Sequence, residues 1–441
     1  RIEKQLLKRN SGYATRFLYD GSMPEEVLKR LIQQLKLKKA NKMPGGRYHN
    51  LKDLSELPMP HDADLFYKEW RAIRPAVDSS IFEKMAQKDF MIHPPYQDYG
   101  TILRFFNEAA IDRSVSEICL TVYRIANDSH IASALISAAK NGKKVTVFVE
   151  LKARFDEANN IRWAKKMKAA GVEIIFSIPG LKVHAKVALV KRKEKNRIRY
   201  YGILGTGNFN EATAKIYSDH ILFTTRRDLV RELELLFIFL GKRKKMKTNF
   251  NQVQFHHLLV SQFNLHERFL QLIEEEIKEA QSGRPAAITL KINNLEGESF
   301  IDKLYEASRA GVKIKLLVRS ICRLVPGIKN QSENISVRRI VDRYLEHNRV
   351  FIFHHKGEEL IFSGSSDWMN RSIKRRIEVC FPVFDEKVKE QLKTMVSLDL
   401  KDNSKAVLLN ENLQNVPVTK GEPLIQAQHE IYKYLKKETL L

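Results

Sequence analysis

Cysteine is scarce in this sequence of 441 residues, which contains only three, Cys119, Cys322 and Cys380. The three are widely separated and odd in number, so they form neither a disulfide framework nor a zinc cluster. Each lies in an apolar run. We therefore predict that all three are reduced and buried, as in a cytoplasmic protein.

Long apolar runs are missing as well. No stretch approaches the roughly 20 residues that a membrane-spanning helix needs, and no signal peptide is recognisable. Any membrane association would therefore be peripheral, at the inner face of the cell membrane. The chain starts at Arg1, without a methionine, in a basic and polar stretch. We expect it to be part of a longer protein.

Two common nucleotide-binding motifs are absent. The sequence has no Gly-x-x-x-x-Gly-Lys-Ser/Thr loop and no Gly-x-Gly-x-x-Gly turn before a helix. A nucleotide would therefore be held mainly through its phosphates and by stacking on an arginine or an aromatic ring. Tyr217 is well placed for such stacking.

Acidic residues are in short supply. There are 52 Asp and Glu against 76 Lys and Arg, which gives a net charge of +24. This excess requires an anionic partner, either nucleic acid, an acidic membrane surface or another polyanion. With 43% hydrophobic and 29% charged residues, the composition is otherwise that of a soluble globular protein with two or three domains.

The most informative stretch is 180–190, where His184 and Lys186 lie two residues apart among alternating apolar residues. The alternation predicts one face of a strand. Imidazole can accept a phosphoryl group near neutral pH, and lysine holds phosphate oxygens as a point charge. A single His-x-Lys pair is weak evidence, because a histidine in a strand is more often structural than catalytic.

The same pattern occurs a second time around His347. His184 is followed by a turn rich in glycine and then by Asp219, and His347 is followed by a similar turn and then by Glu378. The distance from turn to acid is the same in both copies. An acid hydrogen-bonded to the ring would fix the tautomer of the histidine.

Upstream segments repeat too. Residues 138–150 match residues 307–319, and each segment contains a helix end, a glycine stop and a buried strand. Several elements recur in one order, which chance does not explain. We therefore predict two homologous α/β domains that each contribute one histidine to a shared site.

The chain divides into three predicted parts. Residues 1–70, with a helix over 24–37, form the end of a preceding helical domain; residues 71–251 and 252–441 form the two α/β domains. The basic segment 191–199 is interpreted as a loop or hairpin tip. Helices are predicted over 131–140, 163–170, 267–281, 300–310 and 425–437, and strands over 116–123, 144–150, 172–177, 287–292 and 313–319.

Several arginines stand where strand runs end: Arg124, Arg154 and Arg319, with Arg376 just before Glu378. A guanidinium at such a position needs a carboxylate or a phosphate. For each arginine alone, an internal salt bridge explains the residue equally well. Together, beside two histidines, they favour a substrate rich in phosphate. The turns 205–207 and 364–366 can present backbone N–H groups and hydroxyls to the same oxygens.

The segments that carry these residues resemble polyphosphate kinases of the first type. The similarity extends from about residue 45 to at least residue 385, and its longest motifs are 124–129, 149–157, 180–186, 205–210, 340–347 and 366–371. The resemblance implies a head domain followed by two C-terminal domains of phospholipase D-like fold. The expected fold is thus α/β, with two tandem phospholipase D-like domains preceded by the remnant of a helical head domain.

The resemblance also implies an activity, the reversible transfer of the γ-phosphate of ATP to a growing polyphosphate chain. ATP, ADP and inorganic polyphosphate would be its partners, and no specific nucleic acid. His184 would be the phosphohistidine. His347 would be the second catalytic residue and would also contact ATP, as an acid, a base or a phosphate anchor. We expect a homo-oligomer, either a dimer or a tetramer.

The remaining roles follow from the same resemblance. Tyr217 and Arg319 would contact the nucleotide, and Arg376 is expected to join them. Arg124 and Arg154 would belong to a magnesium-phosphate site. Because a guanidinium is always positive, we expect these two to hold phosphate oxygens that carry Mg²⁺.

Two alternatives remain open. A phospholipase D-like phosphodiesterase also uses paired histidines with lysine and asparagine, but the second copy has Arg349 in place of a lysine. A non-catalytic basic module that binds nucleic acid would explain the charge, but no nucleic-acid-binding motif accompanies it.

Overall fold

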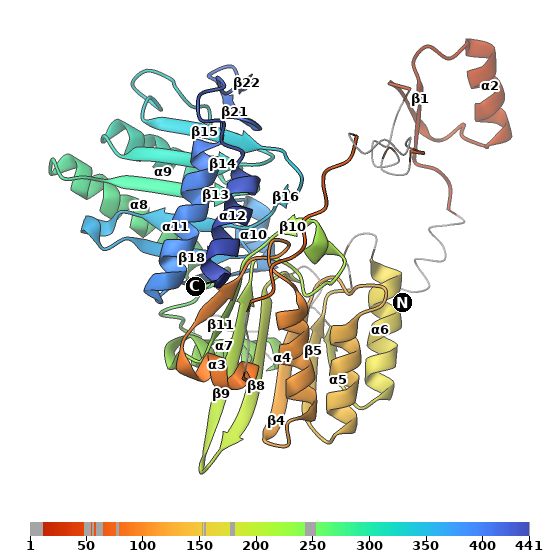
Figure 1. The fold of residues 1–441 in the computed structure, drawn as a ribbon. Coiled ribbons are helices and arrows are strands. Elements are labelled where there is room, and N and C mark those ends of the chain that lie inside the picture. Colours follow the sequence, from red (N-terminus) through yellow and green to blue (C-terminus); the bar gives the residue numbers. More distant parts are fainter. Residues whose placement is uncertain are drawn as a thin grey trace. The chain divides into compact units, whose positions relative to one another are not determined.

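The computed structural model describes residues 12–47, 54, 57–58, 65–75, 79–151, 153, 156–176, 181–242 and 253–440 (Figure 1). The chain forms two compact units, residues 1–69 and residues 70–441. Both predicted α/β domains lie in the second unit. Within the described residues, no helix is long and apolar enough to cross a membrane.

The first unit contains a short β-α-β arrangement. β1 (Arg16–Asp20) and β2 (Asn41–Gly45) pair in parallel, and α2 (Glu25–Gln34) connects them. The helix predicted over 24–37 is confirmed, with Pro24 before it and acidic residues in its first turn, where they favour the helix dipole. The strand pair was not predicted, because all five residues of β2 are exposed and show no alternation.

The first half of the second unit is built on a sheet of seven strands. Its order is β3-β11-β9-β8-β4-β5-β6. The strands β4, β5 and β6 are parallel to one another, and all the other neighbouring pairs in this sheet are antiparallel. The strands are β3 (Phe90–Ile92), β4 (Val115–Val122), β5 (Lys144–Val149), β6 (Glu173–Phe176), β8 (Lys186–Glu194), β9 (Arg197–Gly205) and β11 (Ile221–Thr224). The helices are α3 (Ile81–Gln87), α4 (Gly100–Ile111), α5 (His130–Lys140), α6 (Glu157–Ala169) and α7 (Arg227–Lys242).

The second half repeats this order over seven strands and adds β21 and β22 beyond the last of them. Its nine-stranded sheet runs β12-β20-β18-β17-β13-β14-β15-β21-β22, so β13, β14 and β15 take the places of β4, β5 and β6. The strands are β12 (Leu259–Val260), β13 (Ala287–Ile292), β14 (Lys313–Val318), β15 (Ile335–Ile340), β17 (Val350–Phe353), β18 (Leu360–Gly364), β20 (Val379–Pro382), β21 (Ala406–Leu409) and β22 (Asn415–Pro417). The helices are α8 (Leu265–Gln281), α9 (Glu298–Arg309), α10 (Asn370–Arg375), α11 (Glu386–Lys401) and α12 (Ala427–Leu440).

The predicted duplication is therefore confirmed at the level of topology. One local prediction is confirmed and one was wrong. The segment 191–199, interpreted as a loop or hairpin tip, is the tip of the hairpin that β8 and β9 form, with the turn just after Glu194. The prediction that His184 lies in a strand was wrong. His184 lies in the short gap between β7 (Lys182–Val183) and β8, because β7 does not belong to the seven-stranded sheet.

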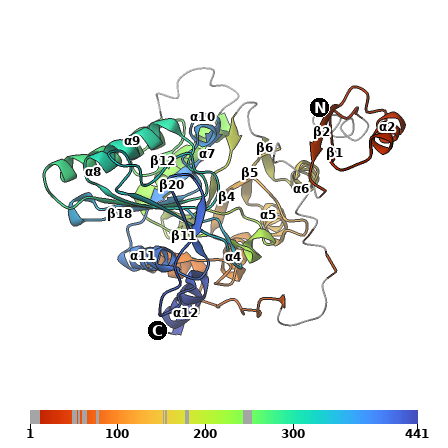
Figure 2. The same cartoon turned by 90° about the horizontal axis from the view of Figure 1, so that it is seen from above.

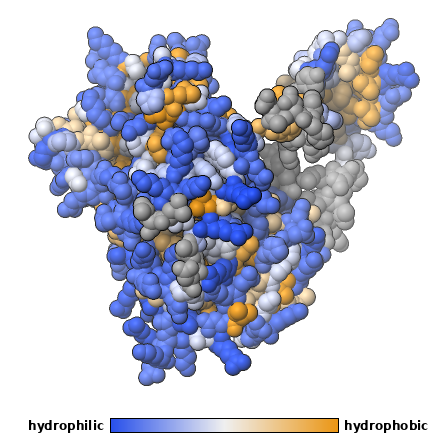
Figure 3. Space-filling model, viewed as in Figure 1, coloured by the Kyte–Doolittle hydropathy of each residue, from blue (hydrophilic) through white to orange (hydrophobic). Residues whose placement is uncertain are grey.

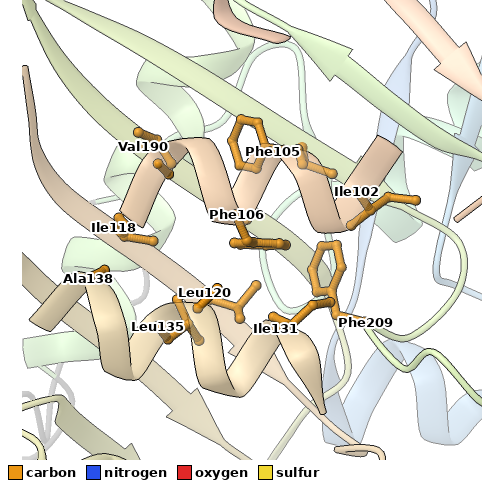
Figure 4. Close-up of a cluster of buried hydrophobic side chains, with 14 of the residues drawn as sticks. Ile102, Phe105, Phe106, Ile118, Leu120, Ile131, Leu135, Ala138, Val190 and Phe209 are labelled. Carbon is orange, nitrogen blue, oxygen red and sulfur yellow. The ribbon is translucent and has the colours of Figure 1, made fainter. Parts of the chain in front are cut away.

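The core of the first half lies between its sheet and the helices α4 and α5. Figure 4 shows Phe106 of α4 pointing toward Leu120 of β4 and Leu135 of α5, and Phe105 belongs to the same buried cluster. Alternate residues of β4 point to opposite faces of the sheet. Leu120 therefore packs under α4 and α5, while Cys119 faces the cluster that contains α7.

A second cluster joins the two halves. Leu233 and Leu236 of α7 share it with Phe381 of β20 and Leu392 of α11, all buried. Seen from above, α7 lies beside strands of the second half (Figure 2). The halves therefore share a continuous apolar core.

The surface seen in Figure 3 is largely hydrophilic, with isolated apolar patches. Cys119 and Cys380 are buried, as predicted, and no disulfide joins any of the three cysteines. Cys322 is only half-buried, contrary to the prediction, because it follows β14 at the end of the sheet rather than inside it.

Candidate active site

Two pairs of short strands cross between the halves. β7 pairs in parallel with β19 (Arg376–Ile377), and β10 (Tyr217–Ser218) pairs in parallel with β16 (Leu345–Glu346). His184 follows β7, and its backbone N–H donates to the carbonyl of Ile377 at 2.9 Å. His347 follows β16, and its N–H is 3.3 Å from the hydroxyl of Ser218. Each histidine is therefore placed by a residue of the other half.

The acids are exchanged in the same way. Nδ1 of His184 lies 2.8 Å from Oε2 of Glu378, and Nδ1 of His347 lies 2.8 Å from Oδ1 of Asp219. The sequence presents each acid after its own histidine, but the structure pairs each acid with the histidine of the other half. Neither half has a complete histidine-acid pair by itself.

Burial and charge set the protonation state of the first pair. Burial lowers the pKa of His184 to about 3, and the cations Lys186 and Arg376 act in the same direction against Glu378. Burial would raise the pKa of Glu378, but His184, Lys186 and Arg376 lower it to about 2. Near neutral pH, Glu378 is therefore a carboxylate and His184 is neutral, with its proton on Nδ1.

This tautomer leaves the lone pair of Nε2 available on His184. Among the described residues, nothing forms a hydrogen bond with His184 Nε2, and 12% of the side chain is exposed. A neutral imidazole with one nitrogen fixed by a carboxylate and the other open is a competent nucleophile.

The second pair is built alike but is more enclosed at Nε2. Burial lowers the pKa of His347, and Arg349 and Lys186 lower it further against the effect of Asp219. Its Nε2 is 3.4 Å from Nη1 of Arg349. Lys186 thus acts on the pKa values of both histidines, which places the two rings in one electrostatic environment.

Two hydroxyls support the acids. Thr206 donates to Asp219 at 2.6 Å, and Ser365 donates to Glu378 at 2.6 Å, each across the same interval of 13 residues. The sequence had led us to expect these hydroxyls on phosphate oxygens. The repeated spacing of each hydroxyl from its acid was the signal that could have revealed their actual partners.

A glycine makes room for one of these acids. A Cβ atom on Gly207 would lie 2.0 Å from Oδ2 of Asp219, so any other residue there would displace the carboxylate. In the second half, Ser366 takes the corresponding position after Ser365. The closer approach of the turn in the first half therefore requires glycine.

Tyrosine rings border both histidines. The ring of Tyr217 lies 5.1 Å from that of His347, and the ring of Tyr123 lies 4.8 Å from that of His184 in an edge-on arrangement. Tyr217 was predicted as a site residue. Tyr123 was missed, because its place at the end of β4 gave no signal beyond the arginine that follows it.

The predicted arginines differ in their partners. Arg124 is paired with Asp156 at 3.2 Å, and Arg376 with Glu378 at 3.3 Å, so internal ion pairs do satisfy these two. Arg319 donates to the amide oxygen of Asn293 at 3.1 Å. No carboxylate among the described residues forms an ion pair with Arg319. Arg154 lies outside the described residues.

Burial lowers the pKa of Arg319. The neighbouring Arg349 lowers it further, and Asp367 and Tyr217 act in the opposite direction. Arg319 and His347 lie near one another, because the side chain of Asn293 bonds to both, and the ring of Tyr217 borders His347. Arg376 adjoins His184 through Glu378. Arg124 is at the edge of this cluster, with its guanidinium 5.9 Å from the ring of Tyr123.

For the predicted magnesium site, the described residues contain no ready set of protein ligands. Within the part of the chain that the structure describes, no three His, Cys, Asp or Glu side chains are gathered as for a metal ion. Arg124 is positive and cannot ligate Mg²⁺. The described residues therefore offer no set of three or more side chains that would hold the metal by themselves.

Three family models match this chain. They are described as the polyphosphate kinase middle domain, over residues 1–57, C-terminal domain 1, over residues 80–246, and C-terminal domain 2, over residues 258–428. Together the matches run through both halves and the first unit.

Curated relatives agree with these matches. The polyphosphate kinase of Yersinia pestis is 41% identical over 440 residues, which are 99% of this chain and 63% of the relative. That of Escherichia coli K12 is 39% identical over 442 residues, with the same coverage of 99% and 63%. The chain thus spans less than two thirds of the length of these relatives.

Solved structures give the same picture. The crystal structure of the polyphosphate kinase of Porphyromonas gingivalis is 41% identical with a TM-score of 0.86, over 96% of this chain and 65% of that one. The phosphatidylserine synthase of Haemophilus influenzae is 9% identical with a TM-score of 0.51, over 80% of this chain and 93% of that one. The second likeness shows the fold alone.

Proposed function

This chain belongs to the polyphosphate kinase family, and on that premise we propose that it transfers the γ-phosphate of ATP reversibly to the end of an inorganic polyphosphate chain, through a phosphohistidine at His184. The observation that carries this proposal is the pairing of His184 Nδ1 with Glu378 at 2.8 Å. It leaves a neutral ring with Nε2 open to an incoming phosphoryl group.

The reaction consists of two in-line transfers. Nε2 of His184 attacks the γ-phosphorus of ATP, the N–P bond forms, and the bond from that phosphorus to the bridging oxygen breaks, so that ADP leaves with the electron pair. A terminal oxygen of polyphosphate then attacks the same phosphorus. The N–P bond breaks and His184 returns to its neutral state.

The cations around His184 stabilise the negative charge of the transferring group. Lys186 lies over the ring of Tyr123 at 5.5 Å and donates to the carbonyl of His184, so it is held beside the attacking ring. Arg319 lacks an acidic partner among the described residues and is the strongest candidate to hold nucleotide phosphates, with Tyr217 and His347 beside it. Arg376, Arg124 and Arg154 are proposed to complete the phosphate contacts.

Because the described residues offer no ligand set, Mg²⁺ would enter bound to the nucleotide phosphates, held by the arginines through those oxygens. The domain limits 1–70, 71–251 and 252–441 are part of the proposal, as are a cytoplasmic location, a homo-oligomeric state and peripheral contact with a membrane. The net charge of +24 supports a polyanionic product.

Labelling tests the proposal. The full-length protein is incubated with ATP that carries radioactive phosphate in the γ-position, and acid-labile label on the protein is measured. We expect His184→Ala to abolish the label. His266→Ala is the matched control, because His266 lies on α8, where its ring contacts Ser299 of α9 and Glu267 and none of the site residues among those described, so labelling should be unchanged.

Retained label in His184→Ala would place the nucleophile elsewhere and overturn the proposal. Polymer formation is followed in parallel on a gel. Cleavage of a phosphodiester without ATP would instead support the phosphodiesterase alternative.

A further inference from the structure

Two equivalent positions beside the histidines carry different charged or polar groups in the two halves. The first half has Lys186 after its histidine and Asn208 in its glycine turn, whereas the second half has Arg349 and Asp367. Lys186 and Gly205 are in register on β8 and β9, and β17 and β18 repeat this hairpin. The exchange therefore adds a carboxylate at the point where the first half has only a neutral amide.

Both carboxylate oxygens of Asp367 contact the guanidinium of Arg349. Nε of Arg349 lies 3.1 Å from Oδ1 of Asp367, and Nη2 lies 3.4 Å from Oδ2. Both residues are buried, at 4% and 6% exposure, so water competes little with this ion pair. The carboxylate also accepts from the backbone N–H of Asn293 and the side-chain amide of Asn294, both at 2.9 Å.

The third guanidinium nitrogen is directed at His347. Nη1 of Arg349 donates to the carbonyl of His347 at 2.7 Å and lies 3.4 Å from Nε2 of the same ring. It is also 3.5 Å from the carbonyl of Thr206. Because Nδ1 of His347 faces Asp219, Nε2 bears the lone pair, and that lone pair is covered by a guanidinium that Asp367 keeps in place.

The first half lacks this cover. Lys186 donates to the carbonyl of His184, and no hydrogen bond from it to Nε2 occurs among the described residues. Asn208 carries no charge that could pair with Lys186. Its Oδ1 is buried and has no hydrogen-bond partner in the described part of the chain. Among the described residues, Lys186 is therefore not paired with a carboxylate of its own turn.

We propose that Asp367 restricts phosphoryl transfer to one histidine per chain. Its carboxylate fixes Arg349 over Nε2 of His347 and neutralises the charge of that guanidinium. His347 then serves as a hydrogen-bonding and proton-transferring partner of the phosphates and is not itself phosphorylated. This inference rests on the proposed function and assigns Asp367 the role of a specificity-determining residue.

The chemical reason is that phosphorylation of either histidine requires the lone pair of its Nε2. An N–P bond at His347 requires its Nε2 to attack the γ-phosphorus while the bond to the leaving ADP breaks. A nitrogen that already accepts a hydrogen bond from a fixed guanidinium is less nucleophilic. A guanidinium paired with a carboxylate also has less charge left to attract phosphate.

The test transfers the chemistry of the first half to the second. In the full-length protein, the double substitution Arg349→Lys with Asp367→Asn recreates the pair found at Lys186 and Asn208. Radioactive γ-labelled ATP is the probe, and mass spectrometry maps the phosphohistidines. We expect label at His184 alone in the natural protein, and at both His184 and His347 in the double variant. With His184→Ala added, the label should remain at His347.

Label at His184 but none at His347 in the double variant overturns the inference, and the label at His184 shows that the variant is folded and that the proposed function holds. Label at His347 in His184→Ala alone also overturns it, since the cover would then be ineffective. No label at all in the natural protein means that the proposed function itself fails, and the inference falls with it.

The opposite substitution keeps the inference falsifiable if the double variant does not fold. Asn208→Asp is nearly isosteric and places a carboxylate at the position equivalent to Asp367. We expect it to lower the rate of labelling at His184 by about ten-fold or more, because the new carboxylate pairs with Lys186. A labelling rate equal to that of the natural protein would contradict the inference.

Discussion

The two halves of the catalytic unit have one topology and two different arrangements of charge. Both sheets run in the same strand order, and both histidines bond to an acid through Nδ1 at 2.8 Å. In contrast, Lys186 and Asn208 of the first half are replaced by the buried ion pair of Arg349 and Asp367. Some features were thus retained in both halves while others diverged.

The difference follows from where each contact lies. The histidine-acid pairs cross between the halves, so a change at Glu378 affects His184 and a change at Asp219 affects His347. The contact of Arg349 with Asp367 lies within the second half and can change without altering the first acid pair. Contacts across the interface therefore tie the halves together, and contacts within a half allow them to specialise.

The largest expected difference between the halves concerns the two acids. Glu378→Gln should lower labelling of His184 by about 100-fold or more, because the amide no longer fixes the proton on Nδ1. Asp219→Asn should leave that labelling within about three-fold of the natural rate and lower transfer to polyphosphate instead, because it acts on His347. Single-turnover labelling and polymer synthesis measure the two steps separately. Equal losses of labelling in the two variants would contradict the different roles of His184 and His347.

The duplication itself could be predicted from the sequence. The repeated histidines, glycine turns and acids keep their order, and the segments 144–150 and 313–319 are both buried strands. The strand predicted over 287–292 has the same limits as β13. Such predictions succeed because alternation, glycine stops and strand length are local properties of the chain.

The exchange of acids could not be predicted. A repeat in sequence says that Asp219 and Glu378 are equivalent, but it does not say which copy of the histidine each one contacts. That depends on the short strands β7 and β10, of two residues each, which pair with the other half and are too short to give an alternation. The hydroxyls of Thr206 and Ser365 are a different case, because each bonds to the acid of its own half at the same spacing of 13 residues, and that repeat is visible in the sequence.

The next prediction concerns pH. The pKa of His184 in the folded protein is about 3, below its usual value near 6.5, so the unfolded chain binds the additional proton first as the pH falls. The contribution of this ring to the free energy of unfolding is therefore present above about pH 6.5 and is lost as the pH falls toward the folded value. Glu378 acts in the same sense below about pH 4.5, since its pKa is lowered to about 2.

Urea unfolding between pH 7 and pH 4 measures this effect. We expect the natural protein to lose stability on the order of a few kcal/mol over that range, and His184→Gln to lose less because its side chain does not titrate. Identical slopes would mean that burial does not hold this ring neutral. The same substitution at His347 gives the comparison for the second half, where the pKa is lowered as well.

A smaller difference is expected for the hydroxyls. Ser365→Ala removes a hydrogen bond to Glu378, and Thr206→Val removes one to Asp219, each of 2.6 Å. The loss of one hydrogen bond to a charged group should cost about ten-fold in the step that its histidine serves. Ser365→Ala should therefore slow labelling and Thr206→Val should slow polymer synthesis. Ser365→Thr keeps the hydroxyl and should restore labelling, which a loss of packing alone would not explain.

The smallest difference between the halves is expected in their cores. Leu120 on β4 and Leu290 on β13 occupy equivalent positions, since each pairs with a parallel strand on one side and an antiparallel strand on the other, and both are fully buried. Replacing either by alanine removes the same methyl groups and leaves a cavity, which should cost about 2–5 kcal/mol. The two losses should agree within about 1 kcal/mol, because the same atoms are removed from equivalent sites. A difference of that size is expected, since the surroundings of the two cavities relax to different extents. Chemical unfolding of the full-length protein measures both. A loss at Leu290 far below that at Leu120 would mean that the second half keeps the strand order of the first without its packing, and the divergence would then extend beyond the charges around His347.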